Sequence, residues 1–94
     1  MFRRQWWFFG KTISDEGFSI NFTEKNTLLY EIGGRTMTVR TDGNFPDIDV
    51  SHSSMRHWNN DSSLIDGKTD ERNVDNVTRA LEWRGFRVRI VTSI

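Results

Sequence analysis

The fold of this chain is decided by residues 69–91, TDERNVDNVTRALEWRGFRVRIV, because two hydrophobic periods meet there. In the first part, apolar residues recur at three- and four-residue spacings, which places them on one face of an α-helix. These residues are Val74, Val77, Ala80 and Leu81. After Gly85, apolar residues alternate with arginines, the period of two that is typical of a half-buried strand. Because glycine readily takes the left-handed conformation that ends helices, the sequence predicts a helix over 69–84 and a strand over 86–91.

The amino end of this helix is also marked in the sequence. Thr69 or Asp70 is predicted to cap the first turn, and Asp70 and Glu71 place negative charge where the helix dipole favours it. Since only one face of the helix is apolar, that face must pack on another element. We expect a sheet formed by the preceding residues to supply it.

The preceding residues contain several segments with strand character. Residues 2–9 include four consecutive aromatic side chains, which fit a pleated surface better than a helix. Apolar and polar residues alternate over 17–23, 27–32, 35–41 and 47–51. Gly33 and Gly34 fit the primed turn of a tight hairpin, whereas residues 10–17 are predicted to be a connection.

The sequence therefore predicts one α+β domain over residues 1–94. It has an antiparallel, twisted sheet of five or six strands, with the helix packed on one face. If the last strand lies parallel to the strand before the helix, we expect a right-handed crossover. The predicted core comprises Trp6, Phe8, Phe18, Ile20, Phe22, Leu28, Tyr30, Ile32, Met37, Val39, Ile48, Val50, Trp58, Val77, Leu81, Phe86, Val88 and Ile90.

Composition limits the class of protein. The chain has 94 residues, of which 35% are hydrophobic and 28% charged, as in one small domain. It has no cysteine, which fits a reducing compartment. The sequence contains no run of about 18 apolar residues, so no membrane-spanning helix is expected. Residues 2–10 lack the cleavage site of a signal peptide. We therefore expect a cytoplasmic protein.

Charge is balanced overall but unevenly distributed along the chain. Residues 41–76 contain eight Asp or Glu and three Lys or Arg, whereas residues 77–94 contain one Asp or Glu and four Lys or Arg. The acidic middle third could face a basic partner, or its loops could simply be solvated.

Two histidines raise an enzyme hypothesis. Histidine can act as acid and base near neutral pH, so His52 and His57 could serve a metal-free ribonuclease, with Arg56 holding the phosphate. Against this, the acidic middle third would repel a polyanion. No metal site is expected, because cysteine and the HExxH pattern are absent, and no cofactor is expected without a phosphate-binding glycine motif. We do not expect an enzyme.

Two further segments could contact nucleic acid. Arg84, Arg87 and Arg89 form a basic cluster that could meet phosphates, as in a small nucleic-acid-binding module, or pair with acidic residues on neighbouring strands. We favour the pairing or a merely solvated sheet face over a contact with phosphates. The aromatic residues 6–9, close to two arginines, could stack nucleobases, but filling the core is the stronger expectation.

One set of features carries a family resemblance. The set consists of YEIGGRTMTV at 30–39, residues 48–50, Ser53-Ser54-Met55 with Trp58, Asn76-Val77 with Ala80-Leu81, and Gly85-Phe86. In this order, within a strand meander, an irregular segment, a capped helix and a last strand, they resemble small immunity proteins of bacterial polymorphic toxin and contact-dependent growth inhibition systems. The resemblance covers about residues 28–91 and leaves the aromatic amino-terminal segment outside.

The resemblance implies a non-catalytic protein that binds one cognate toxin domain and blocks it by occlusion, in the cytoplasm of the cell that makes it. A nuclease toxin would be basic around its substrate groove, so acidic residues are expected in the contact. The residues predicted to bind the partner are Asp47, Asp49, His52, Arg56, His57, Asp61, Asp66 and Asp70. Charge complementarity would speed association, while buried aromatic anchors would supply most of the affinity.

Overall fold

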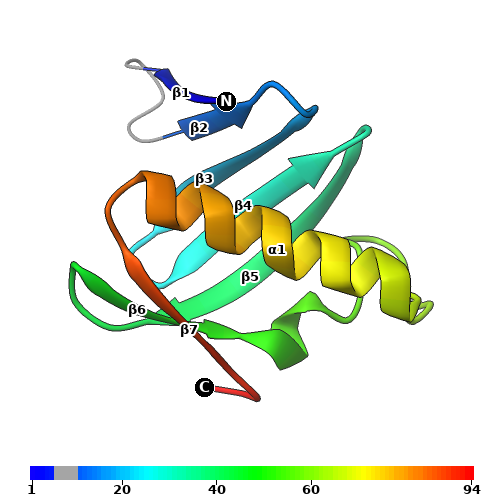
Figure 1. Ribbon diagram of the computed structural model, residues 1–94. Helices are drawn as coiled ribbons and strands as arrows, with labels where there is room; N and C mark the ends of the chain where they lie inside the picture. Colours follow the sequence, from blue (N-terminus) through cyan, green and yellow to red (C-terminus); the bar gives the residue numbers. More distant parts are fainter. Residues whose placement is uncertain (6–10) are drawn as a thin grey trace.

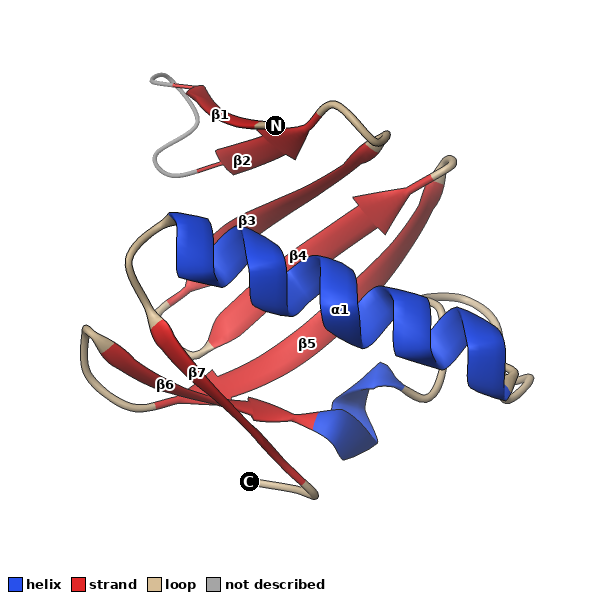
Figure 2. Cartoon of the chain, viewed as in Figure 1, coloured by secondary structure: helices blue, strands red, loops and turns tan. Residues whose placement is uncertain are grey.

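The computed structural model describes residues 1–5 and 11–94, which form a seven-stranded sheet curled around one α-helix (Figure 1). The strands are β1 (Phe2–Gln5), β2 (Lys11–Ser14), β3 (Phe18–Glu24), β4 (Thr27–Ile32), β5 (Arg35–Asp42), β6 (Asp47–Ser51) and β7 (Arg87–Val91). A short 3-10 helix, η2 (His52–Met55), and the helix α1 (Gly67–Trp83) lie between β6 and β7. Figure 2 shows α1 running across one face of the sheet.

The strands lie in the sheet in the order in which they occur in the sequence. Each neighbouring pair from β1 to β6 is antiparallel, and β7 lies parallel to β6 with Asp47 opposite Arg87. The α+β class and the helix on one face are therefore confirmed. The prediction of an antiparallel sheet of five or six strands is roughly right: the described residues form seven strands, and the last pair is parallel, the case for which a crossover was expected.

Strand β2 is the element that the sequence did not predict. Residues 10–17 were expected to be a connection, but Lys11–Ser14 pair with both β1 and β3. The buried side chains of β2 are Thr12 and Ser14, while Ile13 is partly exposed. The Thr12 hydroxyl accepts a 3.0 Å hydrogen bond from Arg84 Nη1, which compensates its burial. Because the inward residues of β2 are polar, the alternation of apolar residues that predicts a strand is absent from this segment.

The hairpin turns and the main core agree with the prediction. Gly33 and Gly34 have φ angles of 57° and 78°, as a primed turn between β4 and β5 requires. The predicted core residues that are buried are Phe18, Ile20, Leu28, Tyr30, Met37, Val39, Ile48, Val50, Trp58, Val77 and Leu81. Four others are partly buried against this core: Phe22, Ile32, Phe86 and Val88.

Ile90 is the exception among the predicted core residues that the structure describes. It remains 39% exposed on β7, which is the last strand of the sheet that the described residues form. Two predicted core residues, Trp6 and Phe8, lie outside the described residues, as does most of the strand predicted over 2–9. Met55 and Ala80 are buried and were not predicted as core.

Helix α1 begins earlier than predicted. Its cap is Asp66, not Thr69 or Asp70, and its first residue is Gly67. Asp66 Oδ1 accepts a 2.9 Å hydrogen bond from the Thr69 backbone N–H, and Oδ2 accepts a 3.0 Å bond from the Thr69 hydroxyl. The Asp-Gly pair resembles a turn in sequence, which concealed this cap. In residues 1–5 and 11–94, no helix has the length and apolar character that crossing a membrane would require.

Candidate partner-binding site

The predicted acidic residues of β6 are paired with arginines of β7. Asp47 lies 2.9 Å from Arg87 Nε, and Asp49 lies 2.9 Å from Arg89 Nη2. Hydrogen bonds from Arg89, with its positive charge, lower the pKa of Asp49. Of the two favoured expectations, a solvated sheet face or pairing with a neighbouring strand, the structure shows the pairing for Arg87 and Arg89. Arg84, the third member of the predicted basic cluster, instead extends to Thr12 on β2.

Three other predicted contact residues hold local structure. Asp61 accepts a 2.9 Å hydrogen bond from the Ser63 backbone N–H, and this bond is the largest cause of its lowered pKa. Asp66 caps α1, as described above. Asp70 Oδ2 lies 2.8 Å from His52 Nε2, which links η2 to α1. These carboxylates are available to a partner only on the sides that their own chain leaves open.

The two histidines have different surroundings among the residues that the structure describes. His52 lines a hollow of about 390 Å³ together with Asp70 and Ile90, and His57 is not part of its lining. His57 Nδ1 donates a 2.9 Å hydrogen bond to the Ser63 carbonyl. Arg56 is exposed, and its carbonyl accepts a hydrogen bond from the Ile65 N–H at 3.0 Å. This geometry provides no support for an acid–base pair with a shared phosphate.

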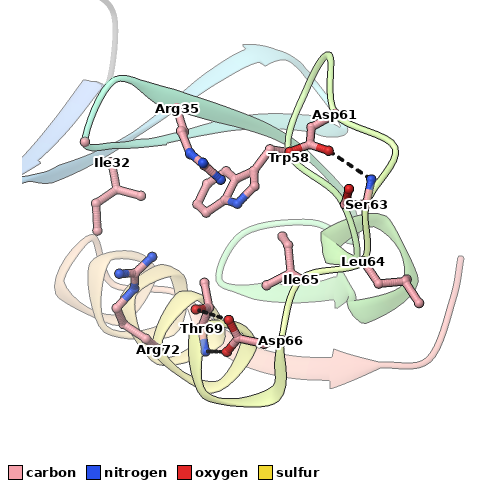
Figure 3. A pocket seen from close by; sticks show the side chains of 11 residues that line it. Ile32, Arg35, Trp58, Asp61, Ser63, Leu64, Ile65, Asp66, Thr69 and Arg72 are labelled. Carbon is pink, nitrogen blue, oxygen red and sulfur yellow. Dashed lines mark hydrogen bonds between the residues drawn. The ribbon is translucent and has the colours of Figure 1, made fainter.

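A different hollow brings together side chains that a binding site needs. It has a volume of about 390 Å³ and lies between the β4–β5 turn, the segment 58–66 and the first turns of α1 (Figure 3). We call it the Trp58 hollow. Its walls are Ile32, Trp58 and Ile65, and the exposed Leu64 lies at its rim. Two arginines also line the hollow, Arg35 on β5 and Arg72 on α1, and in Figure 3 their guanidinium groups extend toward each other.

The arginine on β5 is held in place by stacked rings. The Arg35 guanidinium lies 5.7 Å from the ring centroid of Trp58. Trp58 in turn stacks on Tyr30, with ring centroids 6.2 Å apart and an interplanar angle of 16°. A guanidinium group over an indole face is attracted by the negative charge of the ring face. The orientation of Arg35 therefore depends on a fully buried tyrosine of the core.

The arginine on α1 is held by a polar network under the helix. Arg72 Nη2 donates a 3.1 Å hydrogen bond to Asn73 Oδ1, and the Tyr30 hydroxyl donates to the same oxygen at 2.9 Å. Asn76 Nδ2 then donates to the Tyr30 oxygen at 3.0 Å. Both asparagines are buried. Tyr30 thus supports Arg35 through ring stacking and Arg72 through hydrogen bonds.

The charges that line the Trp58 hollow are balanced in number. Arg35 and Arg72 form no ion pair with any of the residues that the structure describes. Asp61 and Asp66 also line the hollow, and each is engaged by backbone N–H groups that lower its pKa, with smaller contributions from Arg35 and Arg72 respectively. The hollow therefore has little net charge, but its individual side chains can still bind charged groups that come into direct contact with them.

Among the residues that line the hollow, Asp61 and Asp66 were predicted from the sequence as partner contacts, and the two arginines were not. Arg72 belongs to the polar face of an amphipathic helix, where solvated arginines are common, and Arg35 follows a tight turn. Arg72 and Asn73 are adjacent in the sequence, but the burial of Asn73 was not predicted. The approach of β5 to α1 was not predicted either, because it depends on the tertiary packing.

No cluster of three or more His, Asp or Glu side chains that could hold a metal ion occurs within residues 1–5 and 11–94. Comparison of the chain with models of known families, with curated proteins and with solved structures finds no match.

Proposed function

We propose that this chain is a non-catalytic binding protein that neutralises a cognate toxin domain by occluding it, as its resemblance to small immunity proteins implies. The observation that supports this proposal is the Trp58 hollow, which Arg35, Arg72 and the exposed Leu64 all line. Two of the residues predicted to bind the partner, Asp61 and Asp66, line this hollow. In this proposal, the protein acts in the cytoplasm of the bacterium that makes it.

The residue types of the hollow suit a protein–protein contact. Arginine and tryptophan are enriched among the residues that dominate binding energy, and these residues cluster in packed, desolvated pockets. Trp58 is already buried in its own chain, so its role in the proposal is to support Arg35 rather than to anchor the partner. Leu64 is 70% exposed and would supply apolar area at the rim.

The predicted acidic contacts fit this surface only in part. Asp61 and Asp66 line the Trp58 hollow and stay in the proposed interface. Asp47 and Asp49 form ion pairs with β7, so a basic partner would have to compete with Arg87 and Arg89 for them. The proposed interface is therefore centred on residues 58–72 and the β4–β5 turn.

The test is binding to the toxin domain encoded next to this gene. We expect the two proteins to co-purify with sub-micromolar affinity and the toxin to lose its activity in the complex. Leu64→Asp should weaken binding by roughly tenfold or more, because it places a charge in a desolvated contact. A wild-type chain that does not bind this toxin domain would contradict the proposal.

The matched control is Ile94, another exposed apolar residue. Ile94 is 51% exposed and does not line the Trp58 hollow. Ile94→Asp should leave the toxin affinity unchanged. Equal loss of affinity in the Ile94 and Leu64 variants would show that the interface does not lie at the hollow.

A further inference from the structure

We infer that Arg35 and Arg72 form a carboxylate-binding site that receives an Asp or Glu side chain of the partner. The source of that carboxylate, a toxin domain, rests on the proposed function. The carboxylate chemistry itself rests on the two guanidinium groups. This inference reverses the sign of the contact expected from the acidic middle third of the sequence.

The first argument is that both guanidinium groups are oriented in advance. Arg35 lies over Trp58, and Arg72 is bonded to the buried Asn73. A guanidinium group presents N–H donors in a planar fork that matches the two oxygens of a carboxylate. Because Trp58 and Asn73 both contact Tyr30, the two forks are held by one rigid part of the core.

The second argument is that neither arginine has an anionic contact among the described residues. Three other arginines do have one: Arg79 lies 2.8 Å from Glu16, and Arg87 and Arg89 pair with aspartates of β6. The two aspartates that share the Trp58 hollow accept hydrogen bonds from backbone N–H groups instead. Arg72 Nε and Nη2 both donate to Asn73 Oδ1, at 3.4 Å and 3.1 Å, so an incoming anion would be bound by the other N–H groups of Arg72 and by those of Arg35.

The third argument favours a carboxylate over a nucleic-acid phosphate. Asp61 and Asp66 at the hollow cancel the long-range field of the two arginines, so a polyanion would gain little attraction on approach. A protein segment with one Asp or Glu carries a single negative charge, and its neighbouring apolar side chains can be buried in the hollow as well. The walls contributed by Ile32 and Ile65 suit such neighbours.

The first experiment tests the chemistry without any toxin. The arginine Nε–Hε NMR signals of the full chain are followed during titration with a capped pentapeptide that carries one central aspartate between leucines. Its asparagine counterpart and inorganic phosphate are titrated separately. We expect the aspartate peptide to shift the Arg35 and Arg72 signals, with little change at the exposed Arg40.

The other outcomes of this titration would overturn the inference. Equal shifts with the asparagine peptide would show that the carboxylate is not recognised. Shifts with phosphate alone would identify a phosphate site instead, and shifts confined to Arg40 or to no arginine would exclude the site.

The second experiment uses the toxin domain and substitutions at exposed positions. Arg35→Gln and Arg72→Gln should each weaken toxin binding roughly tenfold to a hundredfold, the range for losing a hydrogen bond to a charged group. Arg35→Lys keeps the charge but removes the fork, so it should recover only part of the affinity. Arg40→Gln is the matched control on the same strand and should bind like the wild type.

The two experiments separate the inference from the proposed function. If the toxin binds the wild type and the Arg35→Gln, Arg72→Gln double variant equally well, the carboxylate site is wrong and the proposed function stands. If the toxin does not bind the wild type, the proposed function fails, and the peptide titration alone decides whether the site takes a carboxylate.

Discussion

Tyr30 connects the core of the protein to its candidate binding site. Its ring stacks on Trp58, and its hydroxyl lies between the two buried asparagines of α1. Burial raises the pKa of this hydroxyl, so it stays protonated and can donate to Asn73 at neutral pH. One side chain thereby fixes the distance between β4 and α1 and the surroundings of both hollow-lining arginines.

We predict that Tyr30→Phe destabilises the fold by about 1–3 kcal/mol, because Asn76 Nδ2 loses its acceptor in a buried site. Urea denaturation at neutral pH would measure this. Combining Tyr30→Phe with Asn76→Ala in a double-mutant cycle should give a coupling of about 0.5–3 kcal/mol. Additive effects of the two substitutions would show that the hydrogen bond contributes nothing to stability.

A second residue-scale prediction concerns the cap of α1. The Thr69 backbone N–H and hydroxyl hold the pKa of Asp66 below its usual 3.8. Since the pKa is lower in the folded state, the charged cap stabilises the fold above pH 3.8, and this contribution is lost as the pH falls through the folded pKa. Asp66→Ala should therefore lower Tm at neutral pH, with a difference that shrinks in acid.

The matched variant for this experiment is Asp66→Asn. Asparagine is also a good cap but does not titrate, so this variant should keep most of the Tm at neutral pH and lose part of the acid dependence. Thermal melts followed by circular dichroism across acidic pH provide the comparison. A constant difference between Asp66→Ala and wild type at every pH would contradict the assignment.

At this scale, the sequence predicted which residues are polar and exposed but not what they contact. Asp61 and Asp66 were expected to face a partner, and each also holds a turn or a helix start through bonds to residues two or three positions away. Asn73 and Asn76 were not predicted to be buried. Their burial depends on a tyrosine that only the folded chain brings beside them.

Among the elements, those with a regular period were predictable and those without one were not. The apolar stripe of α1 and the alternation in β3, β4 and β5 identified these elements, and most of their inward residues are buried, whereas Phe22, Ile32 and Val74 are partly buried. Strand β2 lacks an apolar inward face, and η2 lacks any period. Ile90 alternates correctly in sequence, yet it remains 39% exposed on the last strand of the sheet that the described residues form.

The packing of α1 on the sheet leads to a prediction about stability. Leu81 is fully buried on the inner face of the helix. Leu81→Ala should cost about 2–5 kcal/mol, through lost burial and the cavity left behind. Glu82→Ala, at the exposed neighbouring position of the same helix, is the control and should change stability little. A denaturation midpoint that does not move in Leu81→Ala would contradict the helix-on-sheet packing.

Over the whole molecule, the distribution of charge in the sequence was a poor guide to the surface. The acidic middle third and the basic end of the chain become partners, because β6 and β7 lie side by side. The arginines that remain without ion pairs among the described residues at the Trp58 hollow come from β5 and α1, which the sequence places far apart. Their meeting follows from the path of the chain, which charge patterns along the sequence do not reveal.

The parallel pairing of β7 with β6 also has a kinetic consequence. From β1 to β6, each strand pairs with its neighbour in sequence, so these pairs can form with short loops. The β6–β7 pair must instead close a loop that contains η2 and α1, and long-range closure is slow because its entropy is lost before the contacts form. We expect β7 to dock late in folding and to detach early in unfolding.

Val88→Ala would test this order of events, because Val88 lies on β7 opposite Ile48 and is partly buried. A contact that forms after the transition state affects mainly the unfolding rate. Stopped-flow measurements should therefore show faster unfolding and nearly unchanged folding, whereas Val39→Ala in the meander should slow folding. In the cell, the same order would make the carboxyl-terminal strand the first place where heat or a protease opens the molecule.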